Sequence, residues 1–590
     1  MRTIVYKYLF IMHMEGNMNF KELYIENFRN FKEIKLEKLT QKNIVFGEND
    51  IGKTNLIHAL RLLFDWKIRK EQCLESDFHR RDTTNTIVIR VLLDLSDSDN
   101  EDNKKIFAKI KGLLKADEKD LFLELTANYN SESLCGEITL KWGPSIEQLV
   151  DIPQKFQRYE IDDIFNPVYI DSSIKLEEVF KRYLKKKINK SNAINDDELC
   201  LLNTNIDNLN NHIGSLKVVT TIADELSVEY NNYKLENMNI KIKSEIEIDN
   251  IYSKLNPYIE FEDKTYPTCG DGRKKIMEYS LLTLLAKEDE EKKINIFFIE
   301  EVENHLHRSV QLSISKQLFQ DQLFKYMFLS THSSFLIKKI ENATLIKLIS
   351  DGNIIGKSVY YKIPDEYQYL KNKMTDDLTE AIFAKKVLLV EGPSEKQLFD
   401  KVLSTLNKDY ETENKIIISV NGVDFKPYYD ILNKLGIDVI IKTDNDISIY
   451  KNSTTNYPYG RASCIGINRC LNIIEVLSEK DLKFLSIDDQ NLFNIIKSKE
   501  YLYSKYDVFF KSHNIYLSKI DLENDLMDIL TQYSKKLKDE LEISEETIVE
   551  FLQKAKVKNM IKFLEKIKEV QCREIYDSDK FECLKKLCDE

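Results

Sequence analysis

One stretch of the chain has the residue types and spacing needed to bind a nucleotide phosphate. Residues 47–54, GENDIGKT, match GxxxxGK[ST] directly after a predicted strand and before a predicted helix. Such glycines let backbone N–H groups wrap a phosphate at a helix N-terminus, while the lysine reaches the β- and γ-phosphates and the hydroxyl binds Mg²⁺. The residues predicted to bind nucleotide here are Gly47, Asn49, Gly52, Lys53 and Thr54.

A second stretch supplies the carboxylates that such a loop needs for Mg²⁺ and for polarising water. The predicted strand INIFFIE, 294–300, ends in Glu300 and continues with Glu301. We expect Glu300 to act through the metal's water shell and Glu301 to activate the attacking water; the alternative is a solvated helix start. His332, in a Thr-His-Ser-Ser turn after another predicted strand, is expected to sense the γ-phosphate, although a lone histidine is more often structural.

A third group of acids lies in the second half of the chain. Glu391 lies at the end of the apolar run in VLLVEG, Glu395 follows one helical turn later, Gly422 ends IIISVNG, and Asp444 and Asp446 follow DVIIKT. Acids at the ends of neighbouring parallel strands converge at one edge of the sheet. Carboxylate oxygens without His or Cys favour Mg²⁺ or Mn²⁺, and four acids suffice for two ions, an arrangement used in phosphodiester cleavage. Asp-Asn-Asp taken alone is more typical of a turn.

Short apolar runs predict the strands and helices that position these residues. Segment 21–46 is typical of strand, turn and strand, and a helix should start at Thr54. The strands 294–300 and 325–331 flank a helical pattern, which indicates a βαβ unit. A second α/β unit starts at Lys386, and after about residue 470 the chain is predicted to be helical and lysine-rich.

Between the two halves of the first α/β unit the sequence becomes polar and helical, which indicates an insertion. Its basic run could bind DNA, but a solvated helix face is the favoured interpretation. The run comprises Lys181, Arg182, Lys185, Lys186, Lys187 and Lys190. The predicted domains are the first part of the P-loop unit (1–155), the helical insertion (156–256), the second part of the P-loop unit (257–365) and the second α/β unit with its helical C-terminal part (380–590).

Composition narrows the function classes. The 590 residues include 86 basic and 98 acidic ones, a net charge of −12, which argues against a protein coated in positive charge. Nine cysteines without a CxxC pair favour a reduced, cytoplasmic protein without zinc. No apolar run approaches the ~20 residues of a membrane span, and the first 18 residues are expected to be an untargeted extension.

These motifs together resemble a known family. IENFRNF at 25–31, the loop at 47–54, the Glu-Glu pair followed by ENHLH, and STHS resemble the ABC-type ATPase heads of the RecF/SMC/OLD group. The resemblance implies that Glu300 and Glu301 are Walker B acids, that His332 is the switch histidine, and that a signature lies at 268–273. Asp271 in that signature, and Glu300 in place of the commoner Asp, argue against fast hydrolysis and leave regulated binding as an alternative.

The ordered acids resemble a TOPRIM domain. That resemblance implies Glu391 as metal ligand and general acid or base, with Glu395, Asp444 and Asp446 as further ligands. OLD-type nucleases also use a lysine near the C-terminus. The segment KAKVKNMIKFL matches best at Lys556, with Lys554 and Lys558 as rivals and a solvated lysine face as an equal alternative.

An ABC-type ATPase followed by TOPRIM resembles the OLD family of ATP-dependent endonucleases, in particular the Gabija anti-phage nucleases. The expected fold is α/β, with a P-loop ATPase, an inserted helical dimerisation region and a TOPRIM domain with a helical C-terminal part. The resemblance implies a homo-oligomer (dimer or tetramer), a UvrD-like helicase partner (GajB type), Mg²⁺ or Mn²⁺, ATP, and nicking or cleavage of double-stranded DNA under nucleotide control. The alternatives are a RecF-like DNA-binding ATPase scaffold, and a TOPRIM topoisomerase or primase, although no catalytic tyrosine context or zinc module supports the latter.

Overall fold

The computed structural model describes residues 18–589, apart from gaps of one to three residues and several longer segments. The longer segments are 191–195, 235–238, 245–254, 267–270, 362–370, 451–460, 477–484 and 488–502, the last except for 491 and 494. The first 17 residues of the N-terminal extension and the first half of the predicted signature, 268–270, therefore lie outside the described residues.

The P-loop strand lies inside a six-stranded sheet that is parallel except at one edge. Its order is β10 (Phe165–Ile170), β13 (Ile294–Glu300), β14 (Met327–Ser330), β3 (Lys42–Phe46), β15 (Ala343–Asp351) and β16 (Asn353–Tyr361). Successive side chains of these strands enter different cores: Phe297 joins the core shared with the second domain, and Phe298 packs toward the first sheet. Burial on both faces explains the continuous apolar run INIFFI.

A second, antiparallel sheet covers one face of the P-loop sheet, with the helix after the P-loop in the same core. Its strands are β2 (Phe31–Leu36), β1 (Asn19–Phe28), β4 (Ile87–Asp94), β5 (Asp120–Asn130), β6 (Cys135–Gly143) and β7 (Val150–Asp151). The helix is α2 (Lys53–Phe64), whose apolar side chains are almost all buried. Two shorter helices of this region are α3 (Trp66–Lys70) and α4 (Glu101–Lys109).

Helices α5 (Leu176–Lys190), α9 (Asp271–Glu290) and α10 (Arg308–Gln320) pack on the other face. Strand β10 pairs with β13, so residues 165–170 belong to the ATPase sheet and the inserted helices begin later than the predicted residue 156. Pro167 lowers the strand signal of this segment, but it is tolerated because β10 is an edge strand. The basic run lies on α5, where Lys187 and Lys186 pair with Glu288 of α9.

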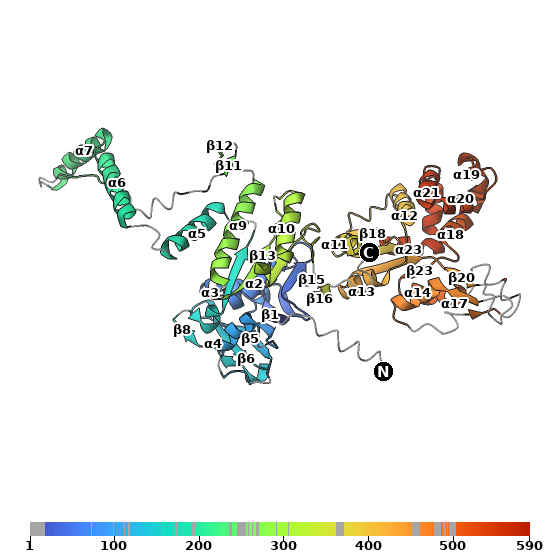
Figure 1. Cartoon of the computed structure of the whole chain (residues 1–590), viewed down its shortest axis with the longest axis horizontal. Helices are drawn as coiled ribbons and strands as arrows, with labels where there is room; N and C mark the ends of the chain where they lie inside the picture. Colours follow the sequence, from blue (N-terminus) through green and yellow to red (C-terminus); the bar gives the residue numbers. More distant parts are fainter. Residues whose placement is uncertain are drawn as a thin grey trace.

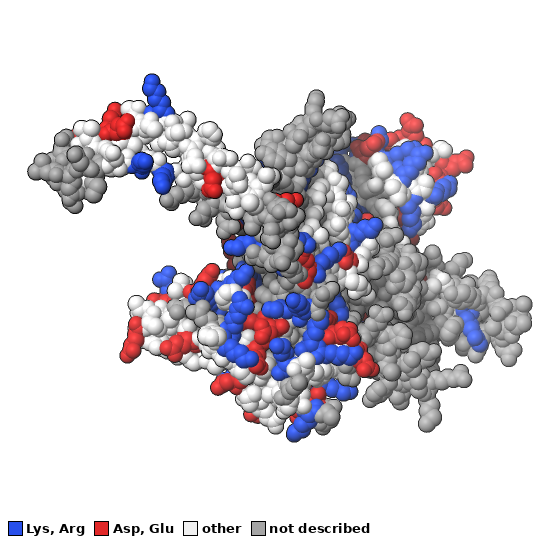
Figure 2. All heavy atoms as spheres, turned by 60° about the vertical axis from the view of Figure 1, so that its left-hand side comes forward, with Lys and Arg blue, Asp and Glu red and all other residues white. Residues whose placement is uncertain are grey.

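Beyond α5, the helices α6 (Asp196–Gly214) and α7 (Lys217–Lys234) form an arm that projects from the body (Figure 1). The arm carries exposed apolar side chains, and few charges appear on it in Figure 2. They include Leu201, Leu209, Leu216, Val218, Ile222, Leu226 and Val228. The small strands β11 (Ile259–Phe261) and β12 (Lys264–Tyr266) follow before α9.

The second domain is built on a parallel sheet of order β18-β17-β19-β23. The strands are β17 (Lys386–Val390), β18 (Lys415–Ser419), β19 (Asp438–Thr443) and β23 (Ile515–Leu517), with helices α12 (Pro393–Thr405) and α13 (Lys426–Lys434) between the first three. The prediction of helices alone after residue 470 was wrong at β23 and at the two-residue strand Leu485–Ser486, because strands of two or three residues are too short for a periodic signal. Strands β20 (Ile447–Tyr450), β21 (Arg461–Cys464) and β22 (Leu485–Ser486) form a small separate sheet.

The C-terminal helices close the other side of this domain around a core of their own (Figure 1). They are α18 (Leu522–Ile529), α19 (Ser534–Glu540), α20 (Ile548–Lys554), α21 (Lys556–Leu564), α22 (Glu569–Asp577) and α23 (Glu582–Cys588). The preceding helices α14 (Ile465–Ile473) and α17 (Tyr503–Lys511) belong to the core shared with the first domain. One continuous core runs from the P-loop sheet through α11 (Lys371–Ala381) into the second sheet. Within the described part of the chain, no helix combines the length and apolar character of a membrane span.

Candidate nucleotide and metal sites

The P-loop has the backbone of a phosphate cradle. Gly47 and Gly52 have φ of 153° and 108°, a region that strains other residues. A Cβ on Gly52 would lie 2.1 Å from Nδ2 of Asn30. The same Asn30 amide donates to the Ile51 carbonyl oxygen at 2.8 Å. The turn between β1 and β2, which contains Asn30, therefore packs against the P-loop and stabilises its backbone. This explains why IENFRNF accompanies the P-loop.

The lysine of the loop folds back over its own backbone. Lys53 Nζ donates to the carbonyl oxygens of Glu48 at 2.7 Å and Gly47 at 3.3 Å. Burial lowers the pKa of Lys53, with Glu301, Asp50 and Glu303 opposing that shift. The ammonium is thus held within the cradle, while Thr54 and Asn49 remain exposed.

The two predicted Walker B acids occupy different environments. Glu300 is buried at the end of β13, accepts a hydrogen bond from the Tyr169 hydroxyl at 3.0 Å, and is hydrogen-bonded to the Thr54 side chain. Burial raises the pKa of Glu300. Glu301 has a φ of 47°, and its N–H donates to the Ser330 carbonyl oxygen at 3.1 Å, which points the chain away from the sheet. Glu300 therefore lies at the Thr54 hydroxyl, which is the P-loop group that would bind a magnesium ion.

A third glutamate, which the motif search did not single out, orients the histidine turn. Oε1 of Glu303 accepts hydrogen bonds from Thr331 Oγ1 and from the His332 N–H, both at 2.7 Å. Burial and the nearby Lys53 lower the pKa of His332, which favours its neutral form at pH 7. The switch turn and the acid pair are thereby fixed to each other beside the P-loop lysine.

A cavity of about 720 Å³ opens beside the P-loop. The β1–β2 turn and the loop after α3 contribute basic groups to its wall, and Asp50 and Asn55 join it to the P-loop. The basic lining residues are Arg29, His79, Arg80 and Arg81. Three of these, Arg29, Arg80 and Arg81, have positive φ, which is uncommon for such side chains.

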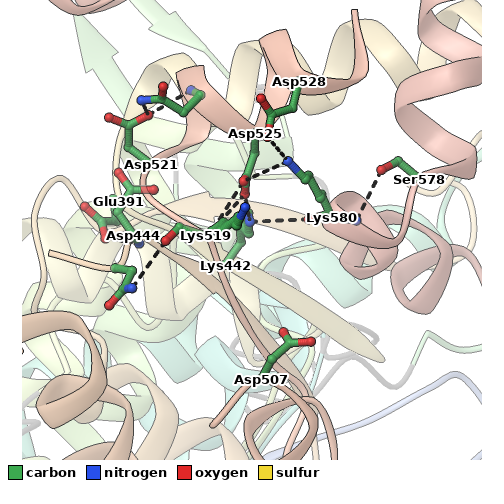
Figure 3. A network of polar contacts seen from close by, with 12 residues as sticks. Glu391, Lys442, Asp444, Asp507, Lys519, Asp521, Asp525, Asp528, Ser578 and Lys580 are labelled. Carbon is green, nitrogen blue, oxygen red and sulfur yellow. Dashed lines mark hydrogen bonds and ion pairs between the residues drawn. The ribbon is translucent and has the colours of Figure 1, made fainter. Parts of the chain in front are cut away.

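In the second domain, the adjacent strands β17 and β19 bring two acids together. Oε1 of Glu391 accepts hydrogen bonds from the Thr443 hydroxyl at 2.5 Å and from the Asp444 N–H at 2.9 Å. Asp444 is 7% exposed. Burial, followed by Glu391, raises the pKa of Asp444 well above its usual range. Figure 3 shows Glu391 and Asp444 side by side at this strand edge.

Two further glutamates lie within electrostatic reach of this pair. Glu395, in the first turn of α12, and Glu523, in the first turn of α18, both raise the pKa of Asp444. Among the described residues Glu523 Oε2 is buried without a hydrogen-bond partner. Lys556 Nζ lies 4.0 Å from Glu523 Oε1, and all four acids raise its pKa, although burial is the largest influence and lowers it.

Asp446 lies apart from this cluster of acids. Its Oδ2 accepts a hydrogen bond at 2.5 Å from Arg469 Nη2, and Nη1 of the same arginine donates to Glu391 Oε1 at 2.6 Å. No group of three or more His, Cys, Asp or Glu side chains in the described residues is arranged to hold a metal ion. Arg469 thus forms ion pairs with both Glu391 and Asp446, and the four-acid ligand set stays a prediction.

A buried charge network fastens the strand below these acids to α18 (Figure 3). Lys442 Nζ, in β19, donates to Asp525 Oδ2 at 3.3 Å, and both side chains are 2% exposed. Lys580 Nζ lies 3.6 Å from Asp525 Oδ1 and also pairs with Asp528. The network fixes α18, and with it Glu523, against the edge that carries Asp444.

Comparison with known proteins agrees with this architecture. The description "AAA ATPase domain" matches residues 18–337, and "Overcoming lysogenization defect protein-like, TOPRIM domain" matches residues 382–446. Over 586 residues, the chain is 38% identical to Endonuclease GajA of Bacillus cereus (strain VD045), covering 97% of this chain and 99% of that protein. The chain belongs to the GajA endonuclease family. This GajA-family chain therefore unites an ABC-type ATPase domain and a TOPRIM nuclease domain, as expected from its motifs.

Other relatives match only parts of the GajA-family chain. DNA replication and repair protein RecF of Caldanaerobacter subterraneus subsp. tengcongensis is 48% identical over 46 residues, 8% of this chain and 13% of that protein. The C-terminal region of the Burkholderia pseudomallei OLD protein covers 35% of this chain and 97% of its own, with 14% identity and a TM-score of 0.21. A solved structure of the recombination mediator protein RecF with ATP covers 57% of this chain and 99% of its own, with 18% sequence identity and a TM-score of 0.32. Because both TM-scores are below 0.5, the assignment to the GajA family rests on the sequence comparisons alone.

The GajA-family fold brings together residues that the motifs left separate. Of the three candidate lysines, Lys556 lies beside the acids, whereas Lys554 pairs with Glu546 on the exposed surface. Glu523 and Arg469 were not predicted, since each stands far from the acid motifs along the chain. Neither residue has a local sequence signal, because polar and charged residues flank both of them in helices α18 and α14.

Proposed function

We propose that the chain is a Mg²⁺-dependent endonuclease that nicks double-stranded DNA at the TOPRIM edge and is controlled by ATP bound at the P-loop. The observation that carries this proposal is the hydrogen-bonded pair of Glu391 and Asp444 at one strand edge of a GajA-family chain, with Glu395 and Glu523 within electrostatic reach of Asp444. Such crowding of negative charge requires a compensating cation.

The donor chemistry fits a hard divalent cation. All four groups are carboxylates, and Glu523 Oε2 is a buried oxygen without a partner in the described structure. Glu391, Glu395, Asp444 and Asp446 would hold the metal, with Mn²⁺ as the alternative to Mg²⁺, and Glu523 is an added candidate. A bound divalent ion would supply Lewis-acid stabilisation of charge on the scissile phosphate.

The chain's own residues have separate roles in this proposal. Glu391, as general acid or base, exchanges a proton with the water or the leaving oxygen, and its carboxylate is oriented by the Thr443 hydroxyl and the Asp444 N–H. Lys556 offers a positive charge beside Glu523, suited to a DNA phosphate. The ion pair of Lys442 and Asp525 fixes β19 and α18, which carry Asp444 and Glu523, relative to each other.

ATP is the proposed nucleotide because the P-loop provides the γ-phosphate contacts. Lys53 would exchange its two loop carbonyls for phosphate oxygens, and Thr54 and Glu300 share the magnesium side. The cavity lined by Arg29 and His79 also contacts Asp50 of the P-loop and Asn55 of α2. We assign this cavity to the ribose and base of the bound ATP. Glu301 and His332 remain the proposed water-activating and γ-phosphate-sensing groups.

Nucleotide control requires contact between the two domains. Glu48 of the P-loop pairs with Lys385 at 3.0 Å, immediately before β17, the strand that Glu391 directly follows. Lys347, in β15 next to the P-loop strand, donates to the Ala384 carbonyl oxygen at 2.8 Å. A change at the P-loop would reach the nuclease strand through these two contacts and the shared core.

The arm of α6 and α7 is the proposed dimerisation surface. Large exposed apolar side chains are costly in water, and several gather on these two helices away from the body. By analogy with the family, we further propose that the chain forms a homo-oligomer, binds a UvrD-like helicase partner and acts in anti-phage defence. The eight described cysteines are free thiols, consistent with the cytoplasm as the proposed location.

The experiment is a nicking assay on supercoiled plasmid with Mg²⁺ or EDTA, with and without ATP. We expect nicking that requires the metal and a rate that changes with ATP. Lys53→Ala should keep the metal-dependent nicking and lose the response to ATP. An unchanged ATP response in this variant would mean that the P-loop is not the sensor, and nicking in EDTA would contradict the metal site.

A further inference from the structure

Arg469 occupies an unusual position for a positive charge. Its guanidinium meets three groups of the TOPRIM edge: Glu391 Oε1 at 2.6 Å, Thr443 Oγ1 at 2.5 Å and Asp446 Oδ2 at 2.5 Å. The arginine side chain is 9% exposed. Two of its partners are acids that the proposed function assigns to a metal ion, so the guanidinium and the ion require the same oxygens.

The backbone of α14 is shaped to bring this arginine to the acids. Gly466 N–H donates to the Asp446 carbonyl oxygen at 3.1 Å. A Cβ on Gly466 would lie 2.3 Å from the Asp444 carbonyl oxygen, so only glycine permits this close approach of the helix to the acid loop. Arg469 follows three residues later and therefore lies on the same helix face.

The charge balance explains why a cation is needed at this position. The negative charges of Glu391, Glu395 and Glu523 act against that of Asp444, while the ammonium of Lys442, which also pairs with Asp525 below the edge, favours it. Lys556 lies on the Glu523 side of the cluster. Arg469 is the positive group that neutralises the opposite side, where Glu391 and Asp446 lie.

We propose that Arg469 is an internal counter-ion of Glu391 and Asp446 that a divalent cation must displace from these two acids, so that the arginine sets the metal affinity. The inference rests on the proposed metal-dependent function and adds a residue that tunes it. A guanidinium that must be displaced weakens metal binding, since breaking two charge-assisted hydrogen bonds opposes the gain from the metal. Arg469 is thus a positioning residue in competition with the ion.

The test is calorimetric titration of Mn²⁺ into the full-length, EDTA-treated chain. Arg469→Gln should bind Mn²⁺ about three- to tenfold more tightly than the wild type, because the competitor is gone. Arg469→Lys should fall between them, since one ammonium cannot bridge both acids. The matched control, Arg573→Gln, removes an exposed arginine that pairs with Glu569 on α22, and should leave the affinity unchanged.

A second readout is the melting temperature. In EDTA, Arg469→Gln should melt below the wild type, because the acids lose their counter-ion, and Mn²⁺ should raise its melting temperature more than that of the wild type. Affinity equal to or weaker than wild type in Arg469→Gln would overturn the inference; if that variant does not fold, the same comparison with Arg469→Lys decides. If Glu391→Gln binds Mn²⁺ as well as the wild type, the proposed metal site itself is wrong, a distinct outcome.

Discussion

Histidine 58 shows how single residues in the ATPase core respond to pH. Its ring stacks on Phe28 with centroids 6.1 Å apart, and burial, followed by Arg29, lowers the pKa of His58 to about 4. The unfolded chain takes up this proton near pH 6.5 and the folded chain only near pH 4. Stability from this group is therefore lost as the pH falls from about 6.5 to 4.

We predict that lowering the pH from 7 to 5 costs the wild type roughly 2 kcal/mol at this residue alone. His58→Gln, which has no titrating ring, should show a smaller loss of melting temperature over the same interval. Calorimetric scans at both pH values measure the difference. Parallel losses in the two proteins would show that His58 does not carry the pH dependence.

At the residue scale, contiguous motifs predicted the sites better than isolated residues did. The P-loop could be read from the sequence because its function depends on eight consecutive residues. Glu303, Arg469 and Glu523 could not be found in this way, since each acts through a partner brought near only by the sheets. The four acids of the second domain were predicted from the ends of the strands alone. The Arg469 guanidinium, which pairs with Asp446, left no local signal in the sequence.

At the scale of elements, the buried pair of Lys442 and Asp525 joins β19 to α18. Replacing Lys442 by Met would leave Asp525 buried with less compensation, and we predict a loss of about 3 kcal/mol in the free energy of unfolding. Lys536→Met, which breaks an exposed pair with Glu540, should cost less than about 0.5 kcal/mol. Urea unfolding of both variants checks this, and equal stabilities would contradict the role given to the network.

The arm of α6 and α7 gives a second prediction at this scale. Ile222 and Leu226 lie one turn apart on α7 and are each 49% exposed. The double substitution Ile222→Ser and Leu226→Ser should shift the oligomer toward a smaller species in light scattering, because it removes apolar contact area. Glu225→Ser on the same helix is the control. An unchanged mass in the double variant would rule out this face as the dimer contact.

Elements with strong local patterns were predicted, and those with weak patterns were not. The βαβ order of both sheets follows from apolar runs separated by amphipathic helices, and β13 with β14 and β17 to β19 agree with it. Strand β23 has only three residues, and β10 contains Pro167. Both were missed because pairing with a neighbouring strand, rather than local sequence, makes them strands.

At the scale of the whole molecule, the contact between the P-loop and the nuclease strand predicts how the domains communicate. Glu48 and Lys385 are each about 60% exposed, so their pair contributes little to stability but links the two sites. Glu48→Lys and Lys385→Glu should each reduce the effect of ATP on the nicking rate by up to about fivefold.

The exchange of both charges is the control for that prediction. It restores the attraction with the signs reversed, and the response to ATP should return. Nicking rates with and without ATP for the four proteins form a double-mutant cycle. Additive effects of the two substitutions would show that the pair does not couple the domains.

The central claim is that the acids at the TOPRIM edge cleave DNA. The most direct measurement is the nicking rate of supercoiled plasmid in Mg²⁺ for the wild type, Glu391→Gln and the exposed control Glu413→Gln. We predict that Glu391→Gln lowers the rate roughly a thousandfold while nucleotide binding and melting temperature persist, and that Glu413→Gln nicks like the wild type. A wild-type rate in Glu391→Gln would contradict the account.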